Sequence, residues 1–562
     1  MNKHWVDKLL TKQSLIAFAK AFGLHVILTA GLTYIISIFL FYIGVKINPL
    51  TLPISFAIAS YILFFSSSKK RKKHLNIAYL LFTIFLYLVM MTISFKFYDI
   101  SWDGQEYHQE TIFTITDKGW NPIKNYDPPT DTFPGLVTWV KHYPKASEIL
   151  SSSIYVITQR IESAKAFNLL FILSSFCLSL FFLTKELKIN LTQSLLLSFI
   201  TAFNPVSVYQ SLTFYLDGEI SSLIICGFIL LIMLARTDKK IYLYSFILII
   251  TLLINFKSTG IIFSVFLCIE YLLLLLMNKH PLKGVIKKAL PLLLAGICAI
   301  CIFGLNPYVY NTIHFKNPAY PLAGENSIDI MTPNRPPGYD KLNKIERILV
   351  SYFMLNVDPN TNRIIPRLPL SNIDLALVQY SDPRIGGFGP FFMEISLLSG
   401  ISILYFLVQK KYNKTIKYKC FFYCCTIFLL ALILPESWWA RYIPLIYVIP
   451  VIIIIPYIIK SKHLPFIIEL LVFFLFINNL YTGAIYTFST TKYSRQIDQA
   501  IEKLRNENSK VYVYKYGEFH NNVQRLKENG IQYEIIEDKN IWESLGEARM
   551  IFYTTPFEIK YY

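Results

Sequence analysis

Ionisable side chains crowd into one short stretch of the sequence, residues 99–110, which reads DISWDGQEYHQE. If a helix begins near Asp103, then Asp103, Glu106 and Glu110 share one of its faces, because residues three and four positions apart meet on a helix surface. Grouped carboxylates can act as a general base or hold a divalent ion such as Mg²⁺ or Mn²⁺. The same spacing is that of a capping pair at an ordinary helix start. The local sequence leaves catalysis and capping open, and His108 is open between a helper and a hydrogen-bonding core residue.

Further charged side chains lie beside apolar segments elsewhere in the chain. Charges near lipid are costly, so they usually pair or line a wet cavity. Lysine and arginine bind anionic leaving groups such as a phosphate, and Lys257 and Arg441 suit this role best. Each one alone is also explained as a helix-end charge that extends to the aqueous boundary. The candidates for substrate binding are His108, Lys141, His142, Lys145, Glu219, Lys257, Arg384, Glu436 and Arg441, and Asp217 joins Asp103 and Glu106 as a candidate catalytic carboxylate.

The composition is that of a membrane protein with many spans. Of the 562 residues, 54% are hydrophobic and only 16% are charged. A soluble enzyme with a single anchor does not need so much apolar sequence. The formal net charge is +18, but Lys and Arg sit in short clusters between the apolar segments. This pattern follows the positive-inside rule, indicates contact with anionic membrane lipids and argues against a nucleic-acid partner.

The apolar segments predict an all-α polytopic membrane protein with about thirteen transmembrane helices. Alternate turns carry a basic cluster, such as KKRKK at 69–73, so we expect the amino terminus in the cytoplasm and the carboxyl terminus outside. Domain 1–485 then holds the spans, with extracytoplasmic loops at about 98–160 and 307–389, and the first of these loops ends in a predicted helix at 144–159. The charged groups fall at the outer ends of the predicted spans. This coincidence favours one active cavity over scattered surface charge.

The last part of the chain, 486–562, loses its hydrophobicity. Strand-like and helical stretches alternate there, which predicts a small extracytoplasmic α/β domain. The domain offers no catalytic motif, and we interpret it as a docking or shielding domain. The expected strands are 511–515, 532–536 and 550–554, and the expected helices lie near 521–529 and 540–546.

Short polar and aromatic motifs punctuate the predicted outer loops and span ends. They are WDGQEYHQE (102–110), GWNP (119–122), HYPKA (142–146), FYLDGE (214–219), NFKSTG (255–260), KNPAYPL (316–322), GGFGP (386–390) and WWARY (438–442). In this order, and on one side of the membrane, they resemble the GT-C superfamily of integral-membrane glycosyltransferases. The chain is most similar to the bacterial branch related to protein O-mannosyltransferases and aminoarabinose transferases.

The resemblance implies transfer of a sugar from a polyprenyl-phosphate donor on the outer face of the bacterial inner membrane. The acceptor would be an envelope glycan, a lipid or a protein. Asp103 or Glu106 matches the acidic position of the family's first outer loop, with Asp103 our first choice for the base. Asp217 matches a second acidic position, and Arg441 with Lys257 matches phosphate binding. Two predicted spans precede the acidic loop here, whereas family members commonly place it after their first span.

Two other functions are weighed against this one. A glycan polymerase or ligase using undecaprenyl-diphosphate substrates also has arginines in a large outer loop, here Arg335, Arg363 and Arg367. The early acidic loop fits that class poorly. A lipid or glycan transporter places charge near the bilayer midplane and often has repeated halves. This sequence concentrates its charge at one boundary and shows no repeat, so the glycosyltransferase is the favoured prediction.

Overall fold

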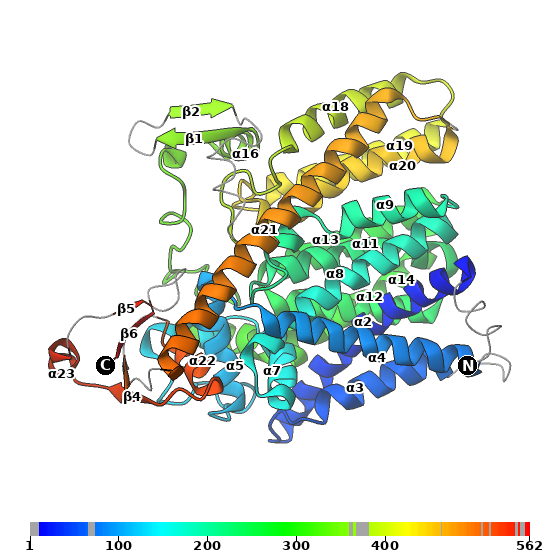
Figure 1. Ribbon diagram of the computed structural model, residues 1–562. Helices are drawn as coiled ribbons and strands as arrows, with labels where there is room; N and C mark the ends of the chain where they lie inside the picture. The colour runs from blue at the N-terminus through cyan, green and yellow to red at the C-terminus, as the bar shows by residue number, and fades with distance from the viewer. Residues whose placement is uncertain are drawn as a thin grey trace.

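The structure is a computed structural model in which helices dominate and one small sheet lies at the carboxyl end (Figure 1). Helix ends are capped where the sequence provides Thr or Asn, as at Thr11 and Asn190, whose side chains accept a backbone N–H of the first turn. The structure describes residues 11–65, 73–358, 363–366, 381–461, 463–506, 510–515, 517, 519–545, 549–550 and 557–561.

Eight of the described helical segments are long and apolar enough to cross a membrane, so the chain is a helical membrane protein. Five shorter apolar helices accompany them at Thr51–Phe65, Leu191–Ala202 (α9), Lys240–Phe256 (α12), Phe392–Val408 (α18) and Pro444–Lys460 (η11 and α20). The count of about thirteen spans stays a prediction. The eight long segments are Lys12–Tyr42 (α2), His74–Lys96 (within α4), Ile161–Glu186 (η5, α8 and η6), Asp217–Thr237 (α11), Thr259–Met277 (α13), Leu282–Phe303 (α14 and η7), Lys414–Ile433 (α19) and Phe466–Asn506 (α21).

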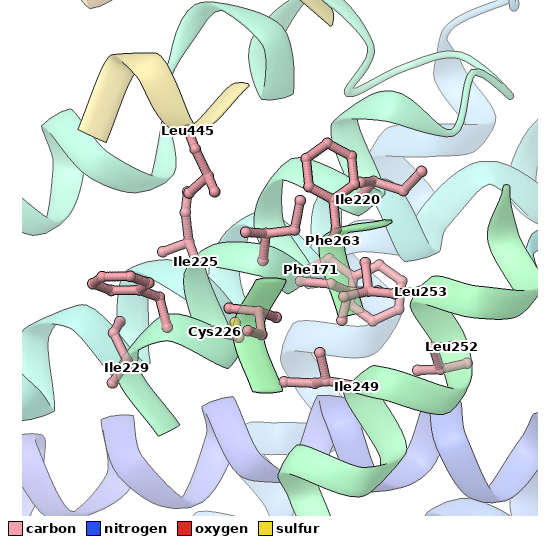
Figure 2. Close-up of a cluster of buried hydrophobic side chains, with 14 of the residues drawn as sticks. Phe171, Ile220, Ile225, Cys226, Ile229, Ile249, Leu252, Leu253, Phe263 and Leu445 are labelled. Atoms are coloured by element: carbon pink, nitrogen blue, oxygen red, sulfur yellow. The ribbon is translucent and has the colours of Figure 1, made fainter. Parts of the chain in front are cut away.

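The helix α11 forms the centre of the bundle. In an apolar stretch of 18 residues of this helix, 94% of the residues are buried. The helix packs against α8, α12 and α13. Figure 2 shows Cys226 of α11 surrounded by Ile249 of α12, Phe263 of α13 and Phe171 of α8. A helix that is apolar on all sides belongs inside such a bundle. Because α11 is held on several sides, the residues at its first turn have a fixed position.

Short elements gather at one end of the bundle, which we call the loop end. A helix was expected in the sequence at about 144–159, and α7 confirms it. The hairpin of β1 and β2 was not expected. These elements are η3 (Gly104–His108), α5 (Gln109–Thr116), η4 (Pro134–Leu136), α6 (Val137–His142), α7 (Ala146–Thr158), α10 (Pro205–Tyr209), η8 (Leu305–Val309), α15 (Tyr310–Phe315), η9 (Tyr339–Lys341), α16 (Lys344–Phe353), β1 (Met354–Asp358), β2 (Arg363–Pro366) and η10 (Ala440–Tyr442).

Among the described residues, the basic clusters at 236–240, 279–288 and 410–419 lie at the opposite end of the bundle, which we call the basic end. Contacts join its turns: Arg236 donates to the carbonyl of Glu186 at 3.1 Å, and Lys419 donates to Asn278 at 2.9 Å. The distribution of charge between the two ends therefore agrees with the pattern read from the sequence. Which end faces the cytoplasm stays a prediction from the positive-inside rule.

The carboxyl-terminal part forms a four-stranded sheet in the order β4-β3-β6-β5. The strands β3 and β4 run parallel, and β6 lies antiparallel to both β3 and β5. The predicted α/β character is confirmed, but the fourth strand, β6, was missed; of the expected strand 550–554, residues 551–554 lie outside the described part. The elements are β3 (Val511–Tyr514), η12 (His520–Asn522), α22 (Val523–Glu528), β4 (Tyr533–Ile536), α23 (Lys539–Ser544), β5 (Arg549–Met550) and β6 (Glu558–Tyr561).

The helix α21 leads from the bundle into this sheet and crosses the expected domain boundary at 485 and 486 without a break. Figure 1 shows it running beside α18 and α20 and continuing past the loop end. Ile497 and Ile501 of α21 join the core of the sheet domain together with Val511, Leu526 and Ile559. The domain is therefore built partly on the last turns of a bundle helix.

Candidate active site

Three charged side chains from separate elements meet at the loop end. Asp217 is the first residue of α11, Lys257 lies in the turn between α12 and α13, and Arg441 lies in η10. The turn at Lys257 depends on Gly260, because a Cβ there would lie 1.8 Å from the carbonyl oxygen of Leu253. Only glycine lets α13 begin so close to α12. The position of Lys257 is thus set by the packing of the two helices.

The contacts within this cluster are an ion pair and two longer approaches. The Nζ of Lys257 lies 2.6 Å from Oδ1 of Asp217. The Nε of Arg441 lies 3.6 Å from Oδ2 of Asp217 and 3.4 Å from Oδ1 of Asp382. Among the described residues, Nε and Nη1 of Arg441 are buried and have no hydrogen-bond partner. A guanidinium held near carboxylates but short of hydrogen bonding keeps donors for an incoming anion.

Aromatic rings enclose the two cations. The guanidinium of Arg441 lies 4.1 Å from the ring centre of Trp439 and 5.1 Å from that of Tyr215. The Nζ of Lys257 lies 4.3 Å from the ring centre of Tyr442. Such rings stabilise a cation and limit its contact with water. They lower the local dielectric and strengthen any interaction between the cations and an anion.

Asp103 lies beside this cluster. Its backbone N–H donates to the hydroxyl of Tyr215, and burial followed by the charges of Asp103 and Asp382 raises the pKa of that hydroxyl. Asp103 precedes η3, and its side chain makes no capping hydrogen bond. The capping alternative is therefore wrong for this residue. Asp103 is half-buried, and within the described part of the chain its carboxylate forms no hydrogen bond or ion pair.

Asp382 belongs to the cluster and was missed from the sequence. Burial raises the pKa of its carboxyl to about 6, against the opposing effect of Arg441 and with a further rise from the charge of Asp103. The available signal was the DPR run at 382–384, of which only Arg384 was selected as a candidate from the sequence. An acidic residue before proline at the end of a loop is common, and only the fold places it against Arg441.

The expected shared face of Asp103, Glu106 and Glu110 does not form. Glu106 has φ −89° and ψ −109°, which are not helical values and break the helical path within η3. Its Oε1 accepts the backbone N–H of Phe519 at 3.2 Å, in the carboxyl-terminal domain. Glu110 is buried and pairs with Lys118 at 2.7 Å. The three carboxylates therefore have separate surroundings, and of the three it is Asp103 that neighbours the Arg441 cluster.

A second buried polar group joins η3, α7 and α11. The Nδ1 of His108 lies 2.6 Å from Oε1 of Glu148, and both side chains are almost fully buried. The carboxylate of Glu219 receives a hydrogen bond from the Ser147 side chain and feels the charge of Glu148. Among the described residues, one oxygen of Glu148 and one of Glu219 have no hydrogen-bond partner. His108 and Glu219 thus tie loop elements to α11 and lie apart from Arg441.

Two of the three basic residues of the KHYPK run at 141–145 connect the first long loop to η8 and α15. His142 contacts Asn311 at 2.7 Å, and burial lowers the pKa of His142 to about 4. Lys145 donates to Asn306 at 2.7 Å. Lys141 stays within the first loop, where it pairs with Asp127 and lies 3.6 Å from the ring centre of Tyr126. The structure therefore gives these predicted binding residues contacts that hold the loops together.

Lys145 is a buried lysine without a carboxylate in hydrogen-bonding range among the described residues. Burial lowers its pKa to about 7, and the charge of Glu148 opposes that change. Its ammonium donates to the carbonyls of Tyr143 and Lys141 as well as to Asn306. All three of these hydrogen bonds of the ammonium are therefore accepted by neutral oxygens.

Arg384 and Glu436 lie at the border of the cluster. Arg384 donates to the side-chain oxygen of Asn334 at 2.7 Å and stacks over Trp439 at 5.4 Å. Glu436 accepts from Arg335 at 2.7 Å and from the indole N–H of Trp438. Both residues thus anchor the second long loop over η10. Of the other two loop arginines, Arg363 lies on β2 and its side chain is outside the described part, and Arg367 lies wholly outside it.

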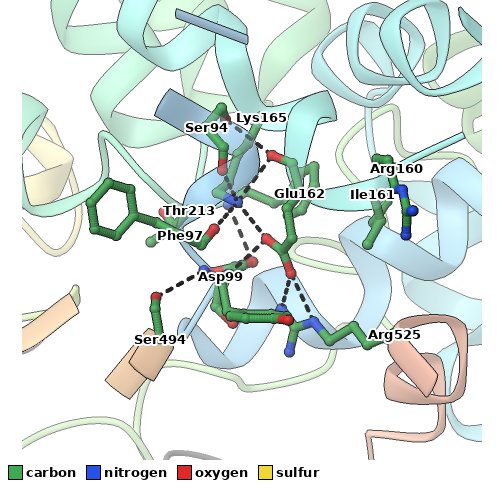
Figure 3. A network of polar contacts seen from close by, with 12 residues as sticks. Ser94, Phe97, Asp99, Arg160, Ile161, Glu162, Lys165, Thr213, Ser494 and Arg525 are labelled. Atoms are coloured by element: carbon green, nitrogen blue, oxygen red, sulfur yellow. Dashed lines mark hydrogen bonds and ion pairs between the residues drawn. The ribbon is translucent and has the colours of Figure 1, made fainter. Parts of the chain in front are cut away.

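A buried ionic network fixes the segments that carry Asp103 and Asp217 (Figure 3). Arg525 of α22 contacts Glu162 at 2.6 Å and donates to the carbonyl of Asp99 at 2.8 Å. Lys165 also contacts Glu162, and it donates to the carbonyl of Phe97 at 2.6 Å. The Oδ2 of Asp99 accepts the N–H of Phe214 at 3.3 Å, three residues before Asp217. Sequence reasoning missed Arg525, whose surroundings give no local signal.

The carboxylates do not assemble a metal site among the described residues. No group of three or more His, Cys, Asp or Glu side chains is placed there to share an ion. Asp217 instead faces Lys257 and Arg441, and cations compete with a metal for its oxygens. The donor set therefore fits anion binding better than metal binding.

No family model matches the sequence, and a search of curated proteins found no match. The class that the fold defines is a multi-pass helical membrane protein with a cluster of opposite charges at its loop end.

Proposed function

We propose that this protein is a membrane glycosyltransferase that moves a sugar from a polyprenyl-phosphate donor to an acceptor of the cell envelope. The observation that carries the proposal is the meeting of Asp217, Lys257 and Arg441 beside Asp103 at the loop end. Segments far apart in the sequence contribute these residues. A lipid-linked donor lies in the membrane and can reach a site at the ends of membrane helices. A soluble nucleotide sugar would not need a site in that position.

In the proposed reaction, Asp103 accepts the proton of the acceptor hydroxyl as that oxygen attacks the anomeric carbon of the sugar. The bond between the anomeric carbon and the phosphate oxygen breaks, and its electron pair leaves with the polyprenyl phosphate. Arg441 and Lys257 stabilise the charge that develops on this leaving group. Asp217 holds both cations in place. The products are the glycosylated acceptor, the lipid phosphate and a protonated Asp103, which then releases its proton to water.

Glu106 was the second candidate for the base. Its carboxylate accepts a backbone N–H of the carboxyl-terminal domain, which favours a structural role. The proposal therefore assigns the base to Asp103. Trp439 and Tyr442 enclose the cations, and Arg384 also stacks on Trp439. Removing any of these rings is expected to weaken donor binding more than it affects the proton transfer.

The test compares Asp103→Asn with Asp131→Asn in the native host. Asp131 is an exposed aspartate of the same loop and lies outside the cluster. With Asp103→Asn we expect envelope glycans to lack one sugar substituent and the lipid-linked donor to accumulate, both measured by mass spectrometry. Asp131→Asn should leave both unchanged. Unchanged glycans in the Asp103→Asn strain, at normal protein level, would contradict the proposal, and loss of lipid or glycan flux with intact glycans would point to a transporter.

A further inference from the structure

A groove separates two groups of helices in the part of the bundle away from the loop end. It has a volume of about 480 Å³. One wall comes from α8, α11 and α13, and the other comes from α19 and α20. In Figure 1 these two groups lie one above the other, with α9 and α11 on one side and α19 and α20 on the other. Its volume falls within the range of roughly 300–1,000 Å³ that ligand sites occupy.

The walls of the groove are apolar along most of its length. Ile225 and Ile229 of α11 face it from one wall, and Ile452 and Ile455 of α20 face it from the other. Leu445 closes the groove toward the loop end, and Figure 2 shows its side chain directed toward Ile225. An apolar groove among membrane helices is filled by hydrocarbon, because water in the groove would contact apolar side chains at an unfavourable free energy.

The other end of the groove is basic. Arg236, Lys419 and Lys460 line it there. Arg236 donates to the carbonyl of Glu186 at 3.1 Å, and the Glu186 carboxylate is 3.9 Å away, at the outer limit of an ion pair. The Nζ of Lys419 donates to the neutral side chain of Asn278 at 2.9 Å. Three cations with one distant carboxylate leave an excess of positive charge at the mouth of the groove.

An apolar groove with a cationic mouth complements one kind of molecule, an amphiphile with hydrocarbon chains and an anionic head. We propose that an anionic phospholipid from the leaflet at the basic end occupies this groove. Its acyl chain lies between α11 and α20, and its phosphate lies between Arg236 and Lys419. The site is separate from the Arg441 cluster and does not rest on the proposed function.

The lipid has a structural consequence for the loop end. The two helix groups meet through η10 and η11, which pack against α11. Leu445 follows Arg441 by four residues, and Ile225 follows Asp217 by eight. A chain held between Ile225 and Leu445 braces the elements that carry Arg441 and Asp217 against each other. Loss of the lipid is therefore expected to loosen α19 and α20 relative to α11.

The experiment uses the full chain, purified and delipidated, and then exposed to vesicles of phosphatidylglycerol or of phosphatidylcholine. Native mass spectrometry counts the lipid molecules retained after collisional activation. We expect the fraction of protein that retains one lipid molecule to be at least tenfold higher with phosphatidylglycerol than with phosphatidylcholine. The double variant Arg236→Gln with Lys419→Gln should remove this preference. The matched control, Lys283→Gln with Lys287→Gln, removes two exposed lysines of the basic end that do not line the groove.

A third variant tests the chain-binding part independently of charge. Ile229→Trp fills the groove and should lower the retention of both lipids, while Arg236 and Lys419 remain. Equal retention of the two lipids by the unaltered protein would overturn the proposal. So would unchanged retention in the double variant, an equal loss in the control, or co-purification of a polyprenyl phosphate in place of a phospholipid.

Discussion

Two ion pairs of this protein have almost the same geometry but different surroundings. Lys257 lies 2.6 Å from Asp217, and Lys118 lies 2.7 Å from Glu110. In both pairs the lysine side chain is 21% exposed and the carboxylate side chain is 5% exposed. Only the first pair lies beside Arg441. Burial alone therefore does not distinguish a binding residue from a structural one. The difference is the neighbouring Arg441, whose Nε and Nη1 make no hydrogen bond among the described residues.

This likeness provides a matched pair of variants. Lys257→Met and Lys118→Met should each lower the free energy of unfolding, by on the order of 3 kcal/mol, because each removes the nearest cation from a buried carboxylate. Only Lys257→Met should lower sugar transfer, by about 100-fold or more, as expected for loss of one donor to the leaving group. Thermal unfolding and transfer in isolated membranes measure the two effects. Equal losses of transfer in both variants would show that stability alone is responsible.

The carboxyl of Asp382 gives the cluster a pH dependence. Its pKa is raised to about 6, so the group is neutral below that pH and negative above it. Above pH 6 the carboxylate partly neutralises Arg441, and below it the guanidinium is freer to bind an anion. Binding of a fluorescent polyprenyl phosphodiester, whose phosphate keeps one charge throughout, should tighten severalfold between pH 7.5 and 5. In Asp382→Asn the binding should be tight and independent of pH; a remaining pH dependence would assign it to another group.

At the scale of elements, a short segment of the carboxyl-terminal domain fixes the turn that carries Asp103. The side-chain amide of Asn521 donates to the carbonyl of Glu106 at 2.8 Å, and Arg525 donates to the side chain of Gln105 at 3.0 Å. Trp102 packs edge-on against Phe519, with ring centres 4.7 Å apart. The domain was interpreted as a docking or shielding unit. That interpretation stays a prediction, and these contacts add a role in supporting the candidate site.

Arg525 is the residue to test for this support. Arg525→Met leaves Asp99 and Glu162 with Lys165 as the remaining cation in a buried network, which should cost about 3–5 kcal/mol of stability. The Asp103 turn should become accessible to protease, as measured by limited proteolysis. Arg505→Met is the control, because Arg505 is exposed and donates only to the carbonyl of Asn529 among its described contacts. If both variants are cleaved at the same rate, the network does not hold the turn.

Apolar periodicity and charge clusters were sufficient to predict the helical membrane fold, α7 and the strands β3 and β4. They also selected Asp217, Lys257 and Arg441, because charge beside apolar sequence is rare enough to notice. They could not pair those residues, since helix packing decides which span ends meet. The broken helix at Glu106 and the position of Asp382 follow from contacts with distant segments. Arg525 lies in an ordinary polar sequence, and only its burial marks it.

At the scale of the whole molecule, the proposed chemistry lies at one end, and the basic clusters of the described part of the chain lie at the other. Of the cations named at the loop end, Lys257 and Arg441 face carboxylates. At the basic end, few of the described carboxylates lie near the Lys and Arg side chains. The remaining positive charge attracts anionic lipid headgroups. This polarity predicts an oriented protein, with the loop end outside and the basic end in the cytoplasm.

Reporter fusions measure the orientation directly. A periplasmic reporter enzyme inserted after Asp131, or joined to the carboxyl end, should be active. The same enzyme inserted after Asp238, in the turn between α11 and α12, should be inactive, and a cytoplasmic fluorescent protein should mature there instead. Activity of the periplasmic reporter after Asp238 would reverse the topology.

The unbroken helix α21 adds a constraint of length and phase. Its 41 residues extend about 60 Å at roughly 1.5 Å per residue, about twice the thickness of a bilayer core. The helix therefore works as a ruler that sets both the height of the sheet domain above the membrane and the direction in which it faces. One residue inserted near Thr491 would rotate everything beyond it by about 100° and turn Arg525 away from Glu162. Seven inserted residues would restore the direction but raise the domain by about 10 Å, so neither change can keep the domain seated on the Asp103 turn.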